Sequence, residues 1–289
     1  MDLKCDFCPR HCSVNRAMGE RGYCGGGTLL RIAAALPHYW EEPCISGVHG
    51  SGAVFFSGCI LRCEFCQNIE ISRNADGGRE TDAAGLQAIF YELVNKNVHN
   101  INLVTGTHFT DVIAEALRIP LPVPVVWNSG GYDSVDALRR LDGKISVYMP
   151  DFKYSDNALA AKLSGVSDYA ERCTEAVTEM YRQVGAAEFD SDGLITKGVI
   201  IRHLLLPEQI QNTLGVIDRV AEIFPDGEVL FSLMSQFTPN GQCKTLSRTV
   251  TADEYESAKL QLFSSGLDGY VQELDSARDG YVPKWDLQP

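Results

Sequence analysis

Short runs of apolar residues alternate along this chain with longer stretches in which apolar residues recur every three or four positions. The short runs predict six β-strands, at 52–57, 101–105, 123–128, 145–149, 198–203 and 229–233. The longer stretches predict helices near 82–97, 110–118, 133–141, 168–185 and 208–224. Asp82 and Asp133 are the predicted N-caps of two of them. Strands that alternate with helices in this way indicate a parallel sheet.

Crossovers of one hand curl such a sheet, so the predicted fold is α/β, with a partial (β/α)6 parallel barrel. A doubly wound open sheet is the alternative, although no Gly-x-Gly-x-x-Gly motif follows the first strand. The predicted divisions are a Cys-rich metal-binding appendage at 1–48, the barrel at 49–240 and a short C-terminal extension at 241–289.

Segments outside the alternating pattern have simpler predictions. Residues 251–265 predict a helix and residues 269–274 a short strand. The polar stretch at 186–197 predicts a loop before the fifth strand. This loop and the tail at 275–289 are candidate gates for a site on the sheet.

The composition is that of an ordinary globular protein. Of 289 residues, 45% are hydrophobic and 22% are charged, which excludes a wholly disordered chain. No apolar run reaches the roughly 18 residues of a membrane-spanning helix, and the opening residues lack the apolar stretch of a secretory signal, so a cytoplasmic enzyme is expected. The net charge of −13 has the wrong sign for a surface that follows phosphates, so nucleic acid is not an expected partner.

Cysteines carry the clearest chemistry, because seven of the ten fall in two tight clusters within the first 66 residues. Clustered thiols in a long chain of this kind indicate metal ligands. One cluster is a Cys-x3-Cys-x2-Cys triplet, Cys59, Cys63 and Cys66, in the loop that leaves the first predicted strand. Three thiolates can each hold one iron of a 4Fe–4S cluster and leave the fourth iron open to a small molecule. Zinc, the alternative, needs a fourth ligand nearby, and no Cys or His follows before His99.

The triplet, the aromatic Phe65 before its third cysteine and its place after the first strand resemble the radical S-adenosylmethionine (radical SAM) enzymes. The run Cys66-Gln67-Asn68 and much of the pattern over 50–240 resemble the branch of the pyruvate formate-lyase activating enzyme. The resemblance implies an anaerobic oxidoreductase in which the open iron chelates the amino and carboxylate groups of S-adenosylmethionine (SAM). One electron from the reduced cluster would break a C–S bond of the sulfonium, and the resulting 5′-deoxyadenosyl radical would remove hydrogen from a substrate.

Ligands of parallel barrels bind at the C-terminal ends of the strands, so those ends are candidate contacts for the cofactor. After the second strand, Thr105-Gly106-Thr107 stands where many relatives have Gly-Gly-Glu, and the glutamate is missing; a plain strand-to-helix turn is the alternative. An arginine at the end of the fifth strand suits the carboxylate of SAM, and a residue after the sixth is implied near adenine. The candidate cofactor-binding residues are Phe65, Thr105, Gly106, Asn128, Ser129, Asp151, Lys153, Arg202 and Gln236.

The ends of the third and fourth strands match elements that jointly hold a monovalent cation in the activating enzymes. The matching positions here are Asn128, Ser129, Met149 and Asp151. Asn128 replaces an aspartate, which removes one charge from the cation site. Asp151 and Lys153 are two positions apart and are expected to share one face of the strand; a structural ion pair is the alternative reading.

The second cluster comprises Cys5, Cys8, Cys12 and Cys24, ahead of the predicted strands. Four thiolates saturate one tetrahedral ion or one cluster, and this stretch has little apolar material of its own. A second metal is therefore predicted here: zinc, mononuclear iron or an auxiliary iron–sulfur cluster. Zinc would be structural only, whereas an auxiliary cluster could relay electrons to the triplet site.

The leading functional hypothesis is a radical SAM enzyme similar to the pyruvate formate-lyase activating enzyme. Its target would be a backbone glycine in a large glycyl radical enzyme, and its electrons would come from a reductant such as flavodoxin or ferredoxin. The alternatives are radical modification of a peptide or a small metabolite, and a non-catalytic iron–sulfur electron carrier. Fold and motif do not decide among them.

Overall fold

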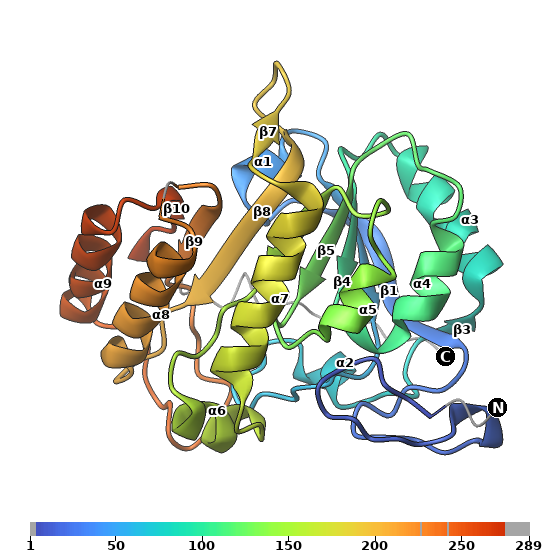
Figure 1. The fold of residues 1–289 in the computed structure, drawn as a ribbon, viewed down its shortest axis with the longest axis horizontal. Coiled ribbons are helices and arrows are strands. Elements are labelled where there is room, and N and C mark those ends of the chain that lie inside the picture. Colours follow the sequence, from blue (N-terminus) through green and yellow to red (C-terminus); the bar gives the residue numbers. More distant parts are fainter. Residues whose placement is uncertain (1–3, 226, 242, 275–289) are drawn as a thin grey trace.

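The computed structural model describes residues 4–225, 227–241 and 243–274. Its centre is an open sheet in the order β10-β9-β8-β6-β5-β4-β2-β1-β3, with β7 paired to β8 (Figure 1). Neighbouring strands from β2 to β9 along this order run parallel. They are β2 (Ser51–Phe56), β4 (Ile101–Val104), β5 (Val125–Ser129), β6 (Val147–Pro150), β8 (Ile195–Leu204) and β9 (Leu230–Met234). The six predicted strands and their parallel arrangement are confirmed.

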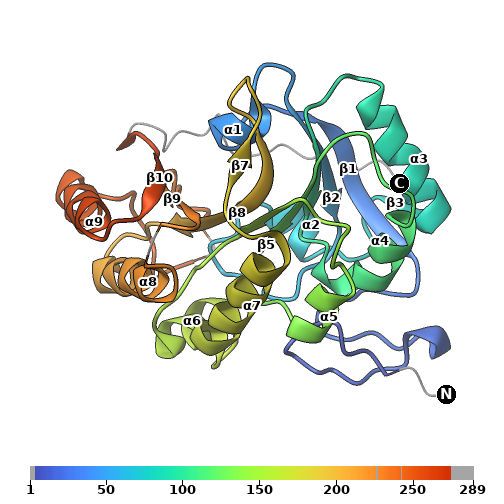
Figure 2. The same ribbon diagram turned by 45° about the horizontal axis from the view of Figure 1, so that its top comes forward.

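Helices cover the outer face of this sheet (Figures 1 and 2). The predicted ones are α3 (Ala83–Val94), α4 (Thr110–Ala116), α5 (Val135–Arg139), α7 (Tyr169–Val184), α8 (Ile210–Ile223) and α9 (Ala252–Ser264). The central strands β2, β4, β5 and β6 are buried along their whole length, which explains why their sequences are mostly apolar. Elements too short for a periodic signal are α1 (Pro43–Ser46), α2 (Ile69–Ser72), α6 (Asn157–Ser164), η1 (Arg16–Met18) and η2 (Thr107–Phe109).

The N-terminal part of the chain departs from the predicted appendage at 1–48. Strand β1 (Leu30–His38) pairs antiparallel with β2, and β3 (Arg79–Thr81) pairs antiparallel with β1. The three alanines at 33–35 weaken the strand signal, because alanine is depleted in strands. Of the described residues before 48, those at 4–29 therefore form the segment outside the sheet, and it lies beneath α2 in Figure 1.

The predicted loop at 186–197 is instead a hairpin between β7 (Glu188–Phe189) and the start of β8. The hairpin projects at the top of Figure 1, from the end of the sheet at which the parallel strands begin. It lies away from the strand C-termini, so its expected role as a gate is wrong. The other candidate gate, 275–289, lies outside the described residues. The predicted strand near 269–274 is β10 (Asp268–Val271), which continues the sheet in parallel with β9.

The two predicted caps have different outcomes. Asp82 caps α3, since its carboxylate accepts the Gly85 N–H at 2.9 Å. Asp133 does not cap α5, which begins after Ser134; its side chain is buried and bonded elsewhere.

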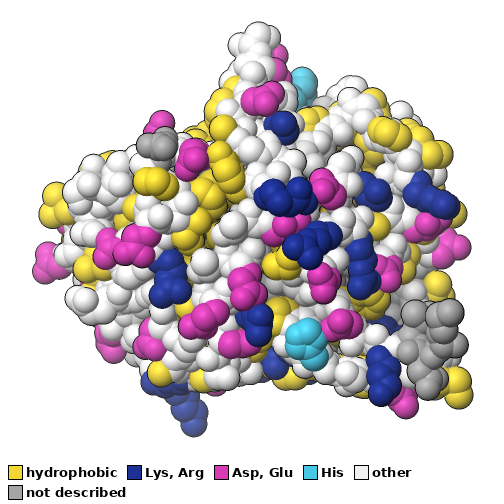
Figure 3. Space-filling model, in the orientation of Figure 1, with side chains coloured by type: hydrophobic (Ala, Val, Ile, Leu, Met, Phe, Trp, Pro, Cys, Tyr) yellow, Lys and Arg dark blue, Asp and Glu magenta, His cyan; other side chains and the backbone are white. Residues whose placement is uncertain are grey.

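The surface of the described residues carries charges of both signs. On the face shown in Figure 3, basic and acidic side chains are interspersed over the helices rather than gathered into one basic stripe. Among the residues that the structure describes, no helix has the length and apolar character needed to span a membrane.

Candidate active site at the strand C-termini

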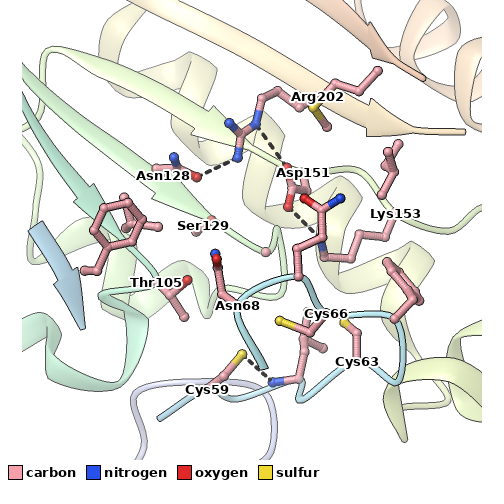
Figure 4. A pocket seen from close by; sticks show the side chains of 18 of the residues that line it. Cys59, Cys63, Cys66, Asn68, Thr105, Asn128, Ser129, Asp151, Lys153 and Arg202 are labelled. Atoms are coloured by element: carbon pink, nitrogen blue, oxygen red, sulfur yellow. Dashed lines mark hydrogen bonds and ion pairs between the residues drawn. The ribbon is translucent and has the colours of Figure 1, made fainter. Parts of the chain in front are cut away.

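A cavity of about 240 Å³ lies at the C-terminal ends of the parallel strands (Figure 4). It is lined by the three cysteines of the triplet and by residues from the ends of β4, β5, β6, β8 and β9. Eight of the nine candidate cofactor-binding residues line it: Phe65, Thr105, Asn128, Ser129, Asp151, Lys153, Arg202 and Gln236.

The triplet lies on the loop between β2 and α2, and none of its thiols is in a disulfide. The Cys59 sulfur accepts the Leu61 N–H at 3.3 Å, and the Cys63 sulfur accepts the Ser164 hydroxyl at 2.9 Å. Burial raises the pKa of the Cys59 thiol to about 12 and also raises the pKa of Cys63. Buried thiols of this kind become thiolates when a metal cation binds them. Three such thiols facing one cavity fit an iron cluster that has one open corner.

The opposite wall carries an ion-pair network centred on Asp151. Its Oδ2 lies 2.5 Å from Lys153 Nζ, and its Oδ1 lies 3.1 Å from Arg202 Nε (Figure 4). Burial alone would raise the pKa of Asp151, but the two cations hold it below its usual value. Asp151 and Lys153 thus share one face, as their spacing predicts. Both carboxylate oxygens already meet cations of the chain itself where the resemblance implies a monovalent cation.

Glu41 joins this network from a segment that is remote in sequence, just after β1. Its carboxylate accepts Arg202 Nη1 at 2.9 Å, Asn102 Nδ2 at 3.0 Å and Asn128 Nδ2 at 3.3 Å. Asn128 in turn accepts Arg202 Nη2 at 2.7 Å. The guanidinium of Arg202 is therefore fixed on three sides. Glu41 is not among the predicted candidates, because its only signal was its place after a strand that was itself not predicted.

The turn after β4 contains a strained residue, Thr105, and a residue that bonds to a buried carboxylate, Thr107. Thr105 lines the cavity with φ at +61°, a left-handed conformation that a β-branched residue rarely adopts. Thr107 and Ser129 donate their hydroxyls to Asp133 at 2.6 and 2.5 Å, which is why Asp133 is buried rather than capping α5.

Two predicted positions are not brought to the cavity. Gly106 is absent from its lining, and a Cβ there would lie 2.7 Å from Ile113 and 3.2 Å from Trp127, so its small size serves packing. Met149 is buried in an apolar cluster with Val126 and Val147.

Phe65 and Gln236 close the side of the cavity next to β9. Phe65 is buried and meets the Phe237 ring edge-on at 6.4 Å between centroids. The Gln236 side-chain oxygen accepts Gln272 Nε2 at 3.0 Å. Gln236 lines the cavity, as predicted. Its amide is fixed by Gln272, the residue after β10.

Asn68 is a further lining residue that the candidate set did not include. Its side chain reaches up into the cavity above Cys59 in Figure 4. Its Oδ1 is buried, and the described residues offer it no hydrogen-bond partner. An unpaired buried acceptor is costly, so this atom fits a site that takes a donor group from a ligand. The run Cys66-Gln67-Asn68 was the available signal.

The four N-terminal thiols lie near one another. Burial is the main cause that raises the pKa of Cys8 to about 12, and the neighbouring Cys24, Cys12 and Cys5 raise it further. Within the described residues, no three Cys, His, Asp or Glu side chains are grouped closely enough for a single metal ion. A metal at this cluster stays a prediction.

His203 is a satisfied structural histidine, as a lone histidine of this kind usually is. Its Nδ1 lies 2.7 Å from the Phe152 carbonyl and its Nε2 lies 2.9 Å from Thr213 Oγ1. Burial lowers the pKa of His203 to about 4, so it stays neutral near pH 7.

Comparisons with known proteins support the fold. No family model matches the chain. An uncharacterized protein of Methanocaldococcus jannaschii is 27% identical over 266 residues, which are 88% of this chain and 72% of that protein.

Among solved structures, Streptococcus suis SuiB bound to its precursor peptide SuiA matches with a TM-score of 0.50 and 14% identity. The match covers 76% of this chain and 48% of SuiB, so the chain spans about half the length of that protein. A radical SAM methyltransferase from Sphaerobacter thermophilus matches with a TM-score of 0.50 and 14% identity, over 78% of this chain and 68% of that one. The chain therefore has the fold found in radical SAM enzymes.

Proposed function

We propose that the protein is a radical SAM enzyme that binds a 4Fe–4S cluster at Cys59, Cys63 and Cys66 and SAM in the adjoining cavity. The observation that carries the proposal is the convergence of the triplet and the ends of five parallel strands on one cavity. When bound, the reduced cluster and SAM together supply a 5′-deoxyadenosyl radical for hydrogen abstraction.

The residues of the chain bind and orient the cofactor. Arg202 presents a planar guanidinium suited to the carboxylate of SAM, and Glu41, Asn128 and Asp151 keep it from reorienting. Asn68 offers its unpaired Oδ1 to a donor such as the amino group of SAM. The monovalent cation is not needed in this proposal, because Lys153 already faces Asp151.

A peptide or protein segment is the substrate that we favour. Trp40 lines the cavity yet is 66% exposed, so an aromatic side chain borders the cavity at the surface. Exposed aromatic residues at a site commonly bind another chain. The S. suis protein of the same fold was solved with a precursor peptide. Within this class, a backbone glycine of a glycyl radical enzyme is the specific target suggested by the resemblance to the pyruvate formate-lyase activating enzyme.

The chemistry is tested by product formation. Protein reconstituted anaerobically with iron and sulfide and reduced with dithionite should convert SAM to 5′-deoxyadenosine, measured by chromatography. Cys63→Ala should abolish the product, because it removes one cluster ligand. Cys44→Ala should retain it, since Cys44 is a buried thiol in a separate apolar cluster. A full cluster without SAM cleavage would instead favour the electron carrier.

The substrate is tested separately. A glycyl radical signal in the electron paramagnetic resonance (EPR) spectrum of a co-purified partner enzyme would support the glycine target. Deuterium transfer into 5′-deoxyadenosine from a labelled peptide, without such a signal, would support peptide modification instead.

A further inference from the structure

We propose that Cys5, Cys8, Cys12 and Cys24 hold a second iron–sulfur cluster, through which electrons enter the triplet site. The delivery of electrons to the triplet site rests on the proposed function, but the presence of a second cluster does not. The first observation is that the segment carrying these thiols contacts the loop of the triplet through Gly58 and Arg10, and it lies beneath α2 in Figure 1.

The two cysteine loops meet at Gly58, the residue before Cys59. Gly58 has φ at +83°, and a Cβ built on it would lie 2.4 Å from the carbonyl oxygen of Cys24. Such a close approach leaves room only for glycine. A ligand residue of one cluster therefore touches the residue next to a ligand of the other.

Arg10 fastens the same two loops together. It lies two residues from Cys8, and its guanidinium donates to the carbonyls of Ile60 and, at 3.1 Å, of Ser164. The hydroxyl of Ser164 donates to the Cys63 sulfur. Arg10 also stacks on Tyr23 at 3.6 Å from the ring centroid, beside Cys24. Contacts from the residues near Cys8 and from Cys24 thus reach either the triplet loop or Ser164, which bonds to the Cys63 sulfur.

The two inner thiols already receive hydrogen bonds from the chain. The Cys8 sulfur receives the backbone N–H of Arg10, as Cys59 receives that of Leu61 in the triplet. The Cys24 sulfur receives the Gly26 N–H at 3.4 Å and Arg16 Nη2 at 3.5 Å. Donors aimed at sulfur are a means by which proteins stabilise iron–sulfur clusters and set their potential.

Burial differs between the two sides of the N-terminal cluster. Cys8 and Cys24 are 8% and 5% exposed, while Cys5 and Cys12 are only partly buried. The cluster would have an inner edge against the triplet and an outer edge near solvent. Such an arrangement would suit an electron entry point, whereas a structural zinc ion carries no electrons.

The electron balance is simple. A low-potential protein reductant of the flavodoxin or ferredoxin class gives one electron to the N-terminal cluster. That cluster passes the electron to the oxidised triplet cluster and returns to its own oxidised state. The reductant is oxidised by one electron, the triplet cluster is reduced by one, and no atom is transferred.

The site is tested in full-length protein in which Cys59, Cys63 and Cys66 are all replaced by alanine. After anaerobic reconstitution we expect about four iron and four sulfide per chain, and an EPR signal after reduction with dithionite. Zinc in place of iron, or no bound metal in a chain that keeps the wild-type circular dichroism spectrum, would overturn the inference. This result is independent of SAM cleavage, so it separates the second cluster from the proposed function.

The electron path is tested with Cys5→Ser/Cys12→Ser, which changes only the two outer thiols. We expect the variant to keep the triplet cluster and SAM binding but to lose 5′-deoxyadenosine formation driven by reduced flavodoxin. Cys44→Ala is the matched control and should retain it. A double variant that keeps its folded spectrum and works at the wild-type rate with flavodoxin would overturn the relay.

Discussion

Single residues at the cavity adopt states that cost free energy in the absence of a ligand. Asn68 keeps a buried oxygen without a partner among the described residues, and Thr105 holds a left-handed backbone. Such costs persist where the surrounding structure imposes them, and they concentrate at functional sites. Both residues lie on the cavity wall close to the triplet, which indicates that this wall is shaped for binding rather than for stability.

Asn68→Ala should weaken SAM binding about five- to tenfold, because a ligand hydrogen bond of about 1 kcal/mol is lost. Isothermal titration calorimetry on the reconstituted protein measures the change. Gln67→Ala is the matched control: Gln67 also lines the cavity, but its amide nitrogen donates to the Gln236 carbonyl at 3.1 Å. Equal losses in the two variants would contradict a specific role for Asn68.

Thr105→Gly should stabilise the protein. Relief of the left-handed strain contributes about 1–2 kcal/mol, and the extra entropy of glycine offsets about 0.5–1 kcal/mol of it. The free energy of unfolding in urea should therefore rise by roughly 0.5–1 kcal/mol. Thr105→Ser, which keeps a Cβ and the hydroxyl, should show no such gain. A glycine variant less stable than wild type would contradict the strain.

Among the elements, the triplet loop is held from two sides. The C-terminal end of α6 bonds to it through Ser164 and through the Leu163 carbonyl, which accepts the Glu64 N–H at 2.9 Å. The N-terminal segment bonds to it through Arg10 and approaches it at Gly58. A short loop with this many contacts keeps its three sulfurs oriented.

Gly58→Ala should separate the N-terminal segment from the triplet loop. Gly143→Ala is the control, since Gly143 has a similar φ of +73° but no atom within 4 Å of an added Cβ. The control should lose about 1–2 kcal/mol from the backbone alone. Gly58→Ala should lose clearly more and retain less iron after gel filtration. Chemical denaturation measures the free energy of unfolding of the two variants, and iron analysis measures the metal they retain. Equal losses in the two variants would show that the close approach to Cys24 does not contribute to stability or iron retention.

The elements also show what the sequence could and could not predict. Strand ends such as Asn128 and Asp151 were predictable, because parallel strands place consecutive C-termini on one edge. Glu41 and Asn68 were not found. The first depends on an alanine-rich antiparallel strand, β1, and the second on an unpaired atom that only coordinates reveal. Gly106 was assigned to the cofactor, although the packing of Ile113 against it explains its size.

At the scale of the whole molecule, the fold buries a neutral histidine, His203, next to a residue of the site. His203 follows Arg202 on β8 and is fully buried, with a pKa lowered to about 4 from the ordinary value of 6.5. Between these two values the unfolded chain binds more protons than the folded one. Stability is therefore present at neutral pH and falls as the pH drops.

Acidification from pH 7.5 to pH 5 should lower the free energy of unfolding by about 2 kcal/mol through His203. Urea unfolding at both pH values measures the drop. His203→Gln, which cannot titrate, should reduce that difference by the same amount. If the variant and the wild type lose equal stability over this range, His203 is not the group responsible.

The central claim is that the three thiols of the triplet hold a cluster with a corner that SAM occupies. It is tested most directly by EPR of the reduced Cys5→Ser/Cys12→Ser protein, in which the triplet supplies the cluster observed, before and after addition of SAM. We expect a reduced 4Fe–4S signal whose g values shift when SAM binds. A signal that SAM leaves unchanged, or no 4Fe–4S signal in folded protein, would contradict the account.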